Sequence, residues 1–187
     1  MEFSEESKLL IEHWGTCEEI LEVAERLEQQ ELPAIREEIM EDIEEADWAE
    51  AWEMEDSNPH KFIMYRPEWI YHDEPIVRIG FSKLWPDRVF GSSTPPLLWV
   101  RVEADYRELL VVPLLDALKE RDAILGKPRR KTHRKFMIEK PVQKCPPEAI
   151  DHYQENLSHQ VMTFFEHYCR VLWDLNDIIQ TKLGELE

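Results

Sequence analysis

The apolar pattern of residues 147–187 constrains the fold of this chain more than any other feature. Apolar side chains recur there every three or four residues, which is the spacing of a helix face. Pro147 suits the first helical position, and a helix from there to the end would be about 55 Å long. Because its apolar arc is wide, we expect other elements to cover it on more than one side. One stripe comprises Ile150, Tyr153, Leu157, Val161, Phe164, Tyr168, Val171, Leu175 and Ile178, and the other Met162, Phe165, Cys169, Leu172, Ile179 and Leu183.

The composition is that of a folded protein with reduced thiols. The chain has 187 residues, 43% of them hydrophobic, which is enough for one well-cored domain. No window reaches the roughly 18 uninterrupted apolar residues of a membrane span, and the first residues lack the pattern of a secretory signal. Three cysteines, Cys17, Cys145 and Cys169, lie far apart. We therefore expect a cytoplasmic protein without disulfides and without membrane contact.

Negative charge is confined to the N-terminal third. Residues 1–58 hold 21 acidic and 3 basic residues, a net charge of −18, whereas residues 59–187 hold 19 of each and are neutral. Charge asymmetry on this scale bears on partners and solubility rather than on fold.

The acidic third reads as two helices. The first runs from Ser4 to about Gln30, with Leu10, Trp14, Cys17 and Leu21 on one face. A break is expected near Leu32, because a residue before proline disfavours helical angles. Pro33 then opens a second helix to about Glu53. We expect the two to form an antiparallel hairpin whose apolar seam lies on the C-terminal helix.

The middle of the chain changes to the period of a sheet. Residues 61–66, 69–71, 76–81, 97–102 and 136–141 alternate or are rich in strand formers, and residues 109–112 read either as helix or as a short strand. The predicted fold is α+β: an acidic helical hairpin (1–58) and a body (59–187) whose long C-terminal helix packs on an antiparallel sheet of three to four strands. We expect the two parts to form one compact unit.

The acidic helices are the leading candidate for function. Few lysines interleave with their carboxylates, so like charges four residues apart repel each other without compensation. This pattern favours a non-enzymatic regulatory protein, such as an inhibitor, antitoxin or immunity factor, that docks a basic protein. The most specific form of this hypothesis is that the carboxylates imitate nucleic-acid phosphates. The alternative is that they form a solvated surface with no binding role. The expected contact residues are Glu18, Glu22, Glu25, Glu37, Glu38, Glu41, Asp42 and Glu45.

Two loops offer further candidates. Residues 127–135 are mainly basic and are expected either to pair with the acidic hairpin or to contact nucleic-acid phosphates. The candidate phosphate contacts are Lys127, Arg129, Arg130, Lys131, Arg134 and Lys135. In the loop 85–96, Trp85, Arg88 and Phe90 are residue types enriched at protein interfaces, so this loop is a second candidate surface.

Evidence for catalysis or for a cofactor is weak. His152, Glu155 and His159 share a narrow arc of the C-terminal helix with Glu166 and are the candidate metal ligands, and His13 and His133 could add ligands from outside. A metal-dependent enzyme is therefore the second alternative function. One helix supplies only part of a coordination shell, and a polar helix face is the alternative. The chain has no H-E-x-x-H, C-x-x-C or G-x-S-x-G motif and no glycine-rich phosphate loop. We therefore expect no cofactor and no catalytic residue.

Residues 60–104 resemble a known kind of accessory region. A strand ending in Arg-Pro-Glu-Trp69 is followed by Val77-Arg-Ile-Gly-Phe81 and Leu98-Trp-Val-Arg-Val102. This order is similar to that in bacterial and phage proteins related to PD-(D/E)XK nucleases. The nuclease motif itself is incomplete: Glu139-Lys140 lacks the intervening residue, and Glu103-Ala-Asp105 has Asp in place of Lys. The resemblance implies a prokaryotic or viral setting and a module without nuclease activity.

Overall fold

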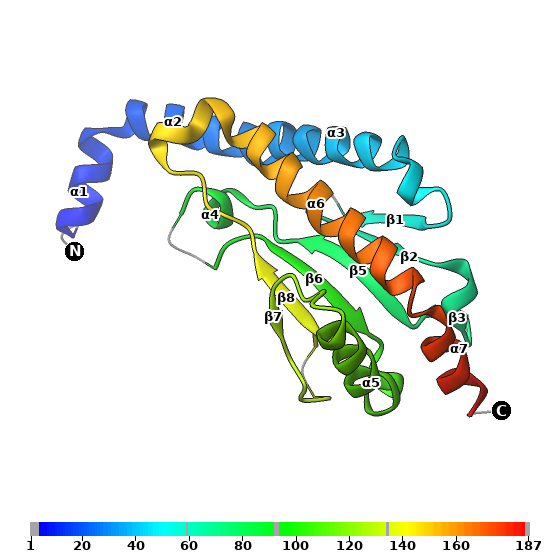
Figure 1. The fold of residues 1–187 in the computed structure, drawn as a ribbon. Helices are drawn as coiled ribbons and strands as arrows, with labels where there is room; N and C mark the ends of the chain where they lie inside the picture. Colours follow the sequence, from blue (N-terminus) through cyan, green and yellow to red (C-terminus); the bar gives the residue numbers. More distant parts are fainter. Residues whose placement is uncertain (1–3, 59, 92–93, 134, 186–187) are drawn as a thin grey trace.

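A six-stranded antiparallel sheet with helices on one face forms the body of the protein (Figure 1). The computed structural model describes residues 4–58, 60–91, 94–133 and 135–185. The strand order is β1-β2-β5-β6-β8-β7, and β3 pairs with β4 separately. The fold is α+β as predicted, but its main sheet is larger than the expected three to four strands. The strands are β1 (Glu53–Asn58), β2 (Lys61–Tyr65), β3 (Ile70–Tyr71), β4 (Glu74–Pro75), β5 (Val77–Ser82), β6 (Leu97–Val102), β7 (Lys127–Pro128) and β8 (Ile138–Pro141).

Apart from the short α4, the helices fall into three groups. An N-terminal series, α1 to α3, leads into the body, α6 lies along the sheet over β5 and β6, and α5 and α7 lie next to each other at one end (Figure 1). The α-helices are α1 (Glu5–Glu12), α2 (Trp14–Arg26), α3 (Leu32–Glu44), α4 (Pro86–Val89), α5 (Arg107–Glu120), α6 (Tyr153–Trp173) and α7 (Asn176–Gly184). Residues 109–112 are therefore helical, and Pro113 lies inside α5.

The C-terminal helix is central, as predicted, but it is not one rod. A 3-10 turn, Pro147–His152, precedes α6, and the helix is interrupted at Asp174 and Leu175 before α7. The interruption places Asn176, whose Oδ1 accepts a 2.8 Å hydrogen bond from the indole N–H of the fully buried Trp69. Most residues of both predicted stripes are buried in the main core, against the sheet and α3.

The two faces of the sheet differ in chemistry. Alternation along the strands sends Phe62, Ile79 and Val100 into the core beneath α6. The opposite face, here called the open face, carries a small apolar cluster of Ile63, Leu97, Trp99 and Phe136 among charged side chains. Trp99 lies across Gly80, and its ring stacks on that of Phe136 with centroids 5.1 Å apart.

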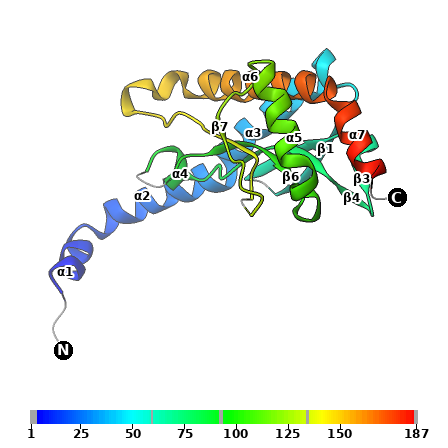
Figure 2. The ribbon, with the colours of Figure 1, turned by 60° about the horizontal axis from the view of Figure 1, so that its bottom comes forward.

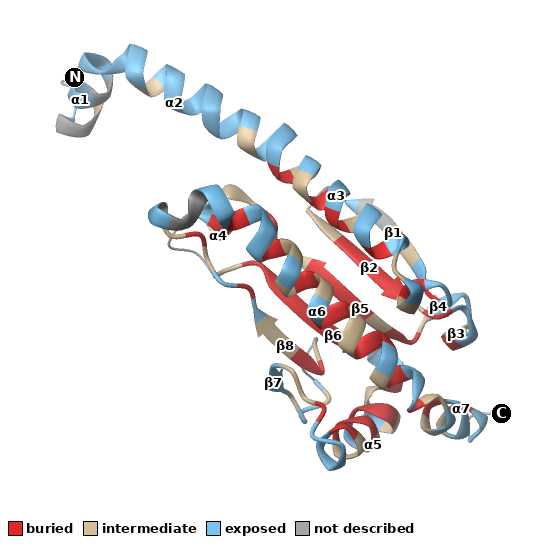
Figure 3. Ribbon diagram, turned by 45° about the horizontal axis from the view of Figure 1, so that its top comes forward, coloured by how far each residue is buried: buried red, intermediate tan, exposed pale blue. Residues whose placement is uncertain are grey.

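The predicted N-terminal hairpin is wrong. A π-helical segment, Leu27–Glu31, joins α2 directly to α3, so the chain does not reverse near Leu32 (Figure 3). Residues 5–31, here called the arm, project from one end of the body (Figures 1 and 2). Of the N-terminal helices, α3 is the one that packs on α6 in the described residues, with Ile39 and Ile43 fully in the core.

The π-helical turn explains why Pro33 does not break the helix. Proline lacks an N–H and its ring clashes with the carbonyl four residues earlier. Here Leu32 keeps helical angles, and its N–H reaches the Leu27 carbonyl one residue farther back than in an α-helix. The wider turn accommodates the ring, so the helix continues.

Strand β1 was not expected from the sequence. Glu53–Asn58 is almost wholly polar, yet it pairs with β2 and extends the sheet at its edge. Residues 32–58 thus belong to the body, through both α3 and β1. Across the described ranges, no helix is long and apolar enough to cross a membrane.

Candidate functional site

The arm is an amphipathic helix whose apolar face is open to solvent. No residue of Trp14–Arg26 is buried, a segment that the structure describes throughout. Large apolar side chains along the arm are between 44% and 66% exposed (Figure 3). They are Leu9, Ile11, Trp14, Ile20, Leu21 and Val23. At 100° per residue those of α2 share one half of the helix, and Glu18, Glu22 and Glu25 occupy the other half.

The eight predicted contact carboxylates do not form one compact patch. Glu18, Glu22 and Glu25 lie on the arm, and the other five lie on α3 or at its end. Because α2 and α3 are continuous, Glu18 and Glu45 are about 40 Å apart along the helix. All eight are exposed. Two of those on α3 contact α6: Glu38 accepts a hydrogen bond from Gln154, and Asp42 accepts one from Ser158 at 3.4 Å.

The basic loop is held by carboxylates of the body. Arg129 donates to Glu139 at 2.7 Å and Arg130 pairs with Asp116. Neither partner belongs to the acidic N-terminal third. Lys127 is part of β7, Lys131 and Lys135 are exposed, and Arg134 lies outside the described residues. The loop thus offers fewer unpaired cations than its sequence indicates.

The three candidates of the loop 85–96 do not converge on one surface. Trp85 packs against His60 with ring centroids 5.2 Å apart, whereas Phe90 lies beside Tyr153 at 6.1 Å. The Arg88 side chain donates to the Thr94 carbonyl at 3.2 Å and so holds its own loop.

The candidate metal ligands lie on the surface of the C-terminal helix. Nδ1 of His152 is 3.9 Å from a carboxylate oxygen of Glu155, and both side chains are highly exposed. His159 lines a groove between α3 and α6 together with Glu155. In the described part of the chain, no three His, Cys, Asp or Glu side chains come together as a metal site would require.

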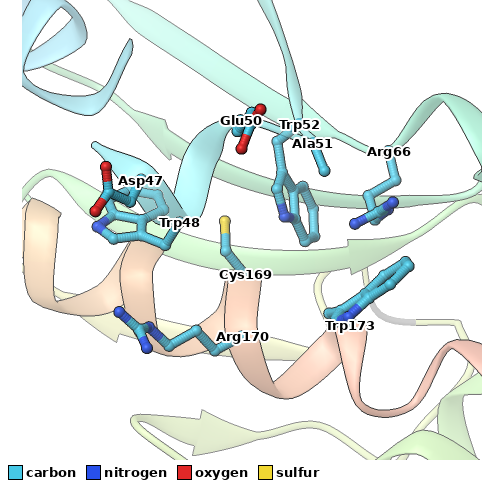
Figure 4. A pocket seen from close by; sticks show the side chains of 9 residues that line it. All are labelled: Asp47, Trp48, Glu50, Ala51, Trp52, Arg66, Cys169, Arg170 and Trp173. Carbon is cyan, nitrogen blue, oxygen red and sulfur yellow. The ribbon is translucent and has the colours of Figure 1, made fainter. Parts of the chain in front are cut away.

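Sequence reasoning missed a pocket that three tryptophans line. Trp48, Trp52 and Trp173 surround a hollow of about 420 Å³ between residues 47–52 and α6 (Figure 4). Arg66 and Arg170 line it as well, and the thiol of Cys169 points into it from α6. Aromatic residues with arginine are typical of contact surfaces.

The thiol in this pocket is unsuited to nucleophilic chemistry. Cys169 is almost fully buried, and that burial raises the pKa of its thiol far above the ordinary value. The reactive species of cysteine is the thiolate, so this side chain stays in its unreactive form. Burial likewise raises the pKa of Cys145.

A second missed pocket lies on the open face. Lysines from three separate segments, Lys61, Lys83 and Lys135, line it together with aromatic rings. Period-2 alternation assigns Lys61 to the face opposite Phe62, but sequence alone does not show which distant segments meet there.

Comparison with known proteins gives no relative: the chain matches no protein-family model, no curated protein and no solved structure. The resemblance to accessory regions of PD-(D/E)XK nuclease-related proteins therefore stays a prediction. The strands that carry it, β2, β5 and β6, are adjacent in the sheet.

Proposed function

We propose that this is a non-enzymatic protein that binds another protein through its arm. The observation that carries the proposal is the exposed apolar face of α2 (Figure 3). Leaving its four large apolar side chains in water, with two more on α1, is costly, and covering each contributes on the order of 1 kcal/mol. A helix of this kind is the ligand in helix-in-groove recognition, where side chains spaced three, four and seven residues apart enter an apolar groove.

The negative charge of the arm indicates the kind of charge that its partner carries. Residues 5–31 carry nine carboxylates and only Lys8 and Arg26 as cations. A groove rimmed with lysine and arginine would complement the acidic half of the helix and accelerate encounter. The exposed carboxylates of α3 extend the same negative field along the body. A basic partner is thus favoured over a neutral one, and an inhibitor, antitoxin or immunity factor would act in this way.

The main alternative partner for the apolar face of the arm is a second copy of the chain. Two arms packed through their apolar faces would bring acidic flanks together, and each close pair of like charges costs a few tenths of a kcal/mol. A basic partner gains from the same charges. Charge complementarity therefore favours a different protein.

Crosslinking from the arm tests the proposal. A photoreactive residue at Ile20 should join the chain to a basic protein in the native cell, and that protein is then purified. Ile20→Asp with Leu21→Asp should weaken binding at least 100-fold in calorimetry, whereas Val112→Asp, at an exposed position of α5, should not.

A charge-reversal experiment is the second test of the proposal. Replacing Glu18, Glu22 and Glu25 with Lys should weaken binding and flatten its dependence on ionic strength. Unchanged affinity of the Asp variants would refute the proposal. A crosslink between two copies, with a dimer in sedimentation, would do so as well.

A further inference from the structure

The pocket on the open face is a cluster of cations lined with rings. It has a volume of about 320 Å³. Lys61 comes from β2, Lys83 follows β5, and Lys135 precedes β8. The register that pairs Lys61 with Ser82 brings the first two together. The remaining lining residues are Asn58, His60, Ser82, Trp85 and Phe136.

The charges of the three lysines are left to attract an anion. In the ranges that the structure describes, no carboxylate forms an ion pair with any of them. Although Lys135 is exposed, its pKa is lowered, first by partial desolvation and then by the charges of Arg101, Lys61, Lys83 and Arg107. The carboxylates on this face are engaged elsewhere or lie at its edge: Glu103 with Arg78 and Arg101, Glu139 with Arg129, and Glu53 and Glu55 on β1.

The backbone around the pocket is held in a strained form. Lys83 has a φ of 72°, in the left-handed region that residues with a Cβ rarely adopt. The Leu84 carbonyl accepts a hydrogen bond from Nδ1–H of His60 at 3.0 Å. The Asn58 side chain accepts from the His60 amide at 2.8 Å. Strain of this kind persists only where surrounding contacts enforce it, and it is common at binding sites.

Most of the acidic part of the chain lies away from this pocket, and Glu53 and Glu55 on β1 are its members at the edge of the open face. The carboxylates of α3 lie on the helical layer, which covers the other face of the sheet, and the arm projects away from the body (Figures 2 and 3).

We propose that this pocket binds a single-stranded nucleic acid, with Lys61, Lys83 and Lys135 on successive phosphates and the rings of Trp85 and Phe136 against the bases. A single strand fits better than a duplex because only unpaired bases expose their faces for stacking. Lysine charge with nearby rings is the combination by which proteins hold single strands without reading sequence. The site shares Lys135 with the end of the basic loop and is separate from the arm.

Anisotropy of a fluorescein-labelled oligothymidylate of 12 nucleotides, titrated with the full chain, tests the proposal. We expect saturable binding at 50 mM NaCl. Three neutralised phosphates give a slope of about −2 in log affinity against log salt, so binding should weaken about 20-fold at 200 mM. Lys61→Glu, Lys83→Glu and Lys135→Glu together should abolish it. Trp85→Ala should weaken it about 5- to 150-fold.

Matched controls distinguish binding at this pocket from a general effect of net charge. The variant Lys119→Glu, Lys127→Glu, Lys131→Glu changes the net charge equally on other surfaces and should bind almost normally. Lys→Gln at the three pocket positions repeats the test with milder changes, and thermal melting verifies folding of each variant. The proposal is overturned if no oligonucleotide binds, if the pocket variants still bind, or if a 12-residue polyglutamate peptide competes as well as unlabelled oligothymidylate. That last outcome would indicate an acidic protein segment, such as the arm of a second copy.

Discussion

The guanidinium carbon of Arg66 lies 3.7 Å from the ring centroid of Trp173, and the same guanidinium donates two hydrogen bonds to Glu68. Arg66 is itself buried. The planar cation is thus held between a ring and a carboxylate at the edge of the tryptophan-lined pocket (Figure 4).

Replacing Arg66 with Lys should destabilise the fold by about 1–3 kcal/mol. Lysine keeps the charge but neither stacks as a plane nor forms the two-pronged bond, so the conservative change is not conservative here. Trp173→Ala should cost about 1–2 kcal/mol through the lost cation–π contact. Urea unfolding measures both effects. Arg170→Lys, at an exposed ion pair with Glu166, is the control and should change stability by less than about 0.5 kcal/mol. Wild-type stability of Arg66→Lys would contradict this account.

The same glycine-to-alanine change should have opposite effects at two positions. A Cβ at Gly80 would lie 2.1 Å from the ring of Trp99, so Gly80→Ala should destabilise the sheet by about 1–3 kcal/mol. At Gly15, in α2, a Cβ meets nothing within 4 Å. Gly15→Ala should raise arm helicity, since alanine is favoured by about 1 kcal/mol in a helix. Urea unfolding and far-ultraviolet circular dichroism make the comparison. Equal stability of Gly80→Ala and the wild type would show that the ring moves freely.

Stability should fall in acid partly through Glu103. Burial alone would raise the pKa of this carboxyl, but the Ala104 amide, Arg101 and Arg78 outweigh it and lower the pKa below the usual 4.5. A lowered folded-state pKa stabilises the fold at higher pH, and that contribution is lost as the pH falls through it. Glu103→Gln should therefore be less stable than the wild type at pH 7. The difference should shrink progressively below about pH 4.5. Urea unfolding at several pH values tests this, and a pH-independent difference would speak against it.

Thiol labelling should report the openness of the arm. Cys17, on the unburied helix α2, should react with a maleimide in the native state. Cys145 and Cys169 are buried, and burial raises the pKa of both thiols, so they should react only after unfolding. Mass spectrometry should find one adduct per native chain and three in denaturant. Protection of Cys17 that disappears on dilution would show that the arm is covered by another copy.

Helices and strands whose apolar residues recur regularly were predictable from the sequence, and strands at the edge of the sheet were not. Strand β6 has the bounds expected for it, residues 97–102, because its alternation is uninterrupted. Both stripes of the C-terminal helix were placed correctly for the same reason. Strand β1 was missed because Glu53–Asn58 has almost no apolar residue, and it forms only because β2 offers an unpaired edge.

Among the candidate sites, too, one was predictable from the sequence and another was not. The exposed carboxylates could be read from charge alone, whereas the pocket of Lys61, Lys83 and Lys135 depends on strand register and loop closure. The three lysines are far apart in the chain and carry no common pattern.

By itself, the sequence determined the fold class, the central place of the C-terminal helix and the segregation of charge, because these follow from local periodicity and composition. Tertiary structure decided that Pro33 lies within a continuous helix, that the arm stays uncovered, and which side chains share a pocket. Each of these depends on long-range packing and on hydrogen bonds between distant segments, which local patterns do not encode.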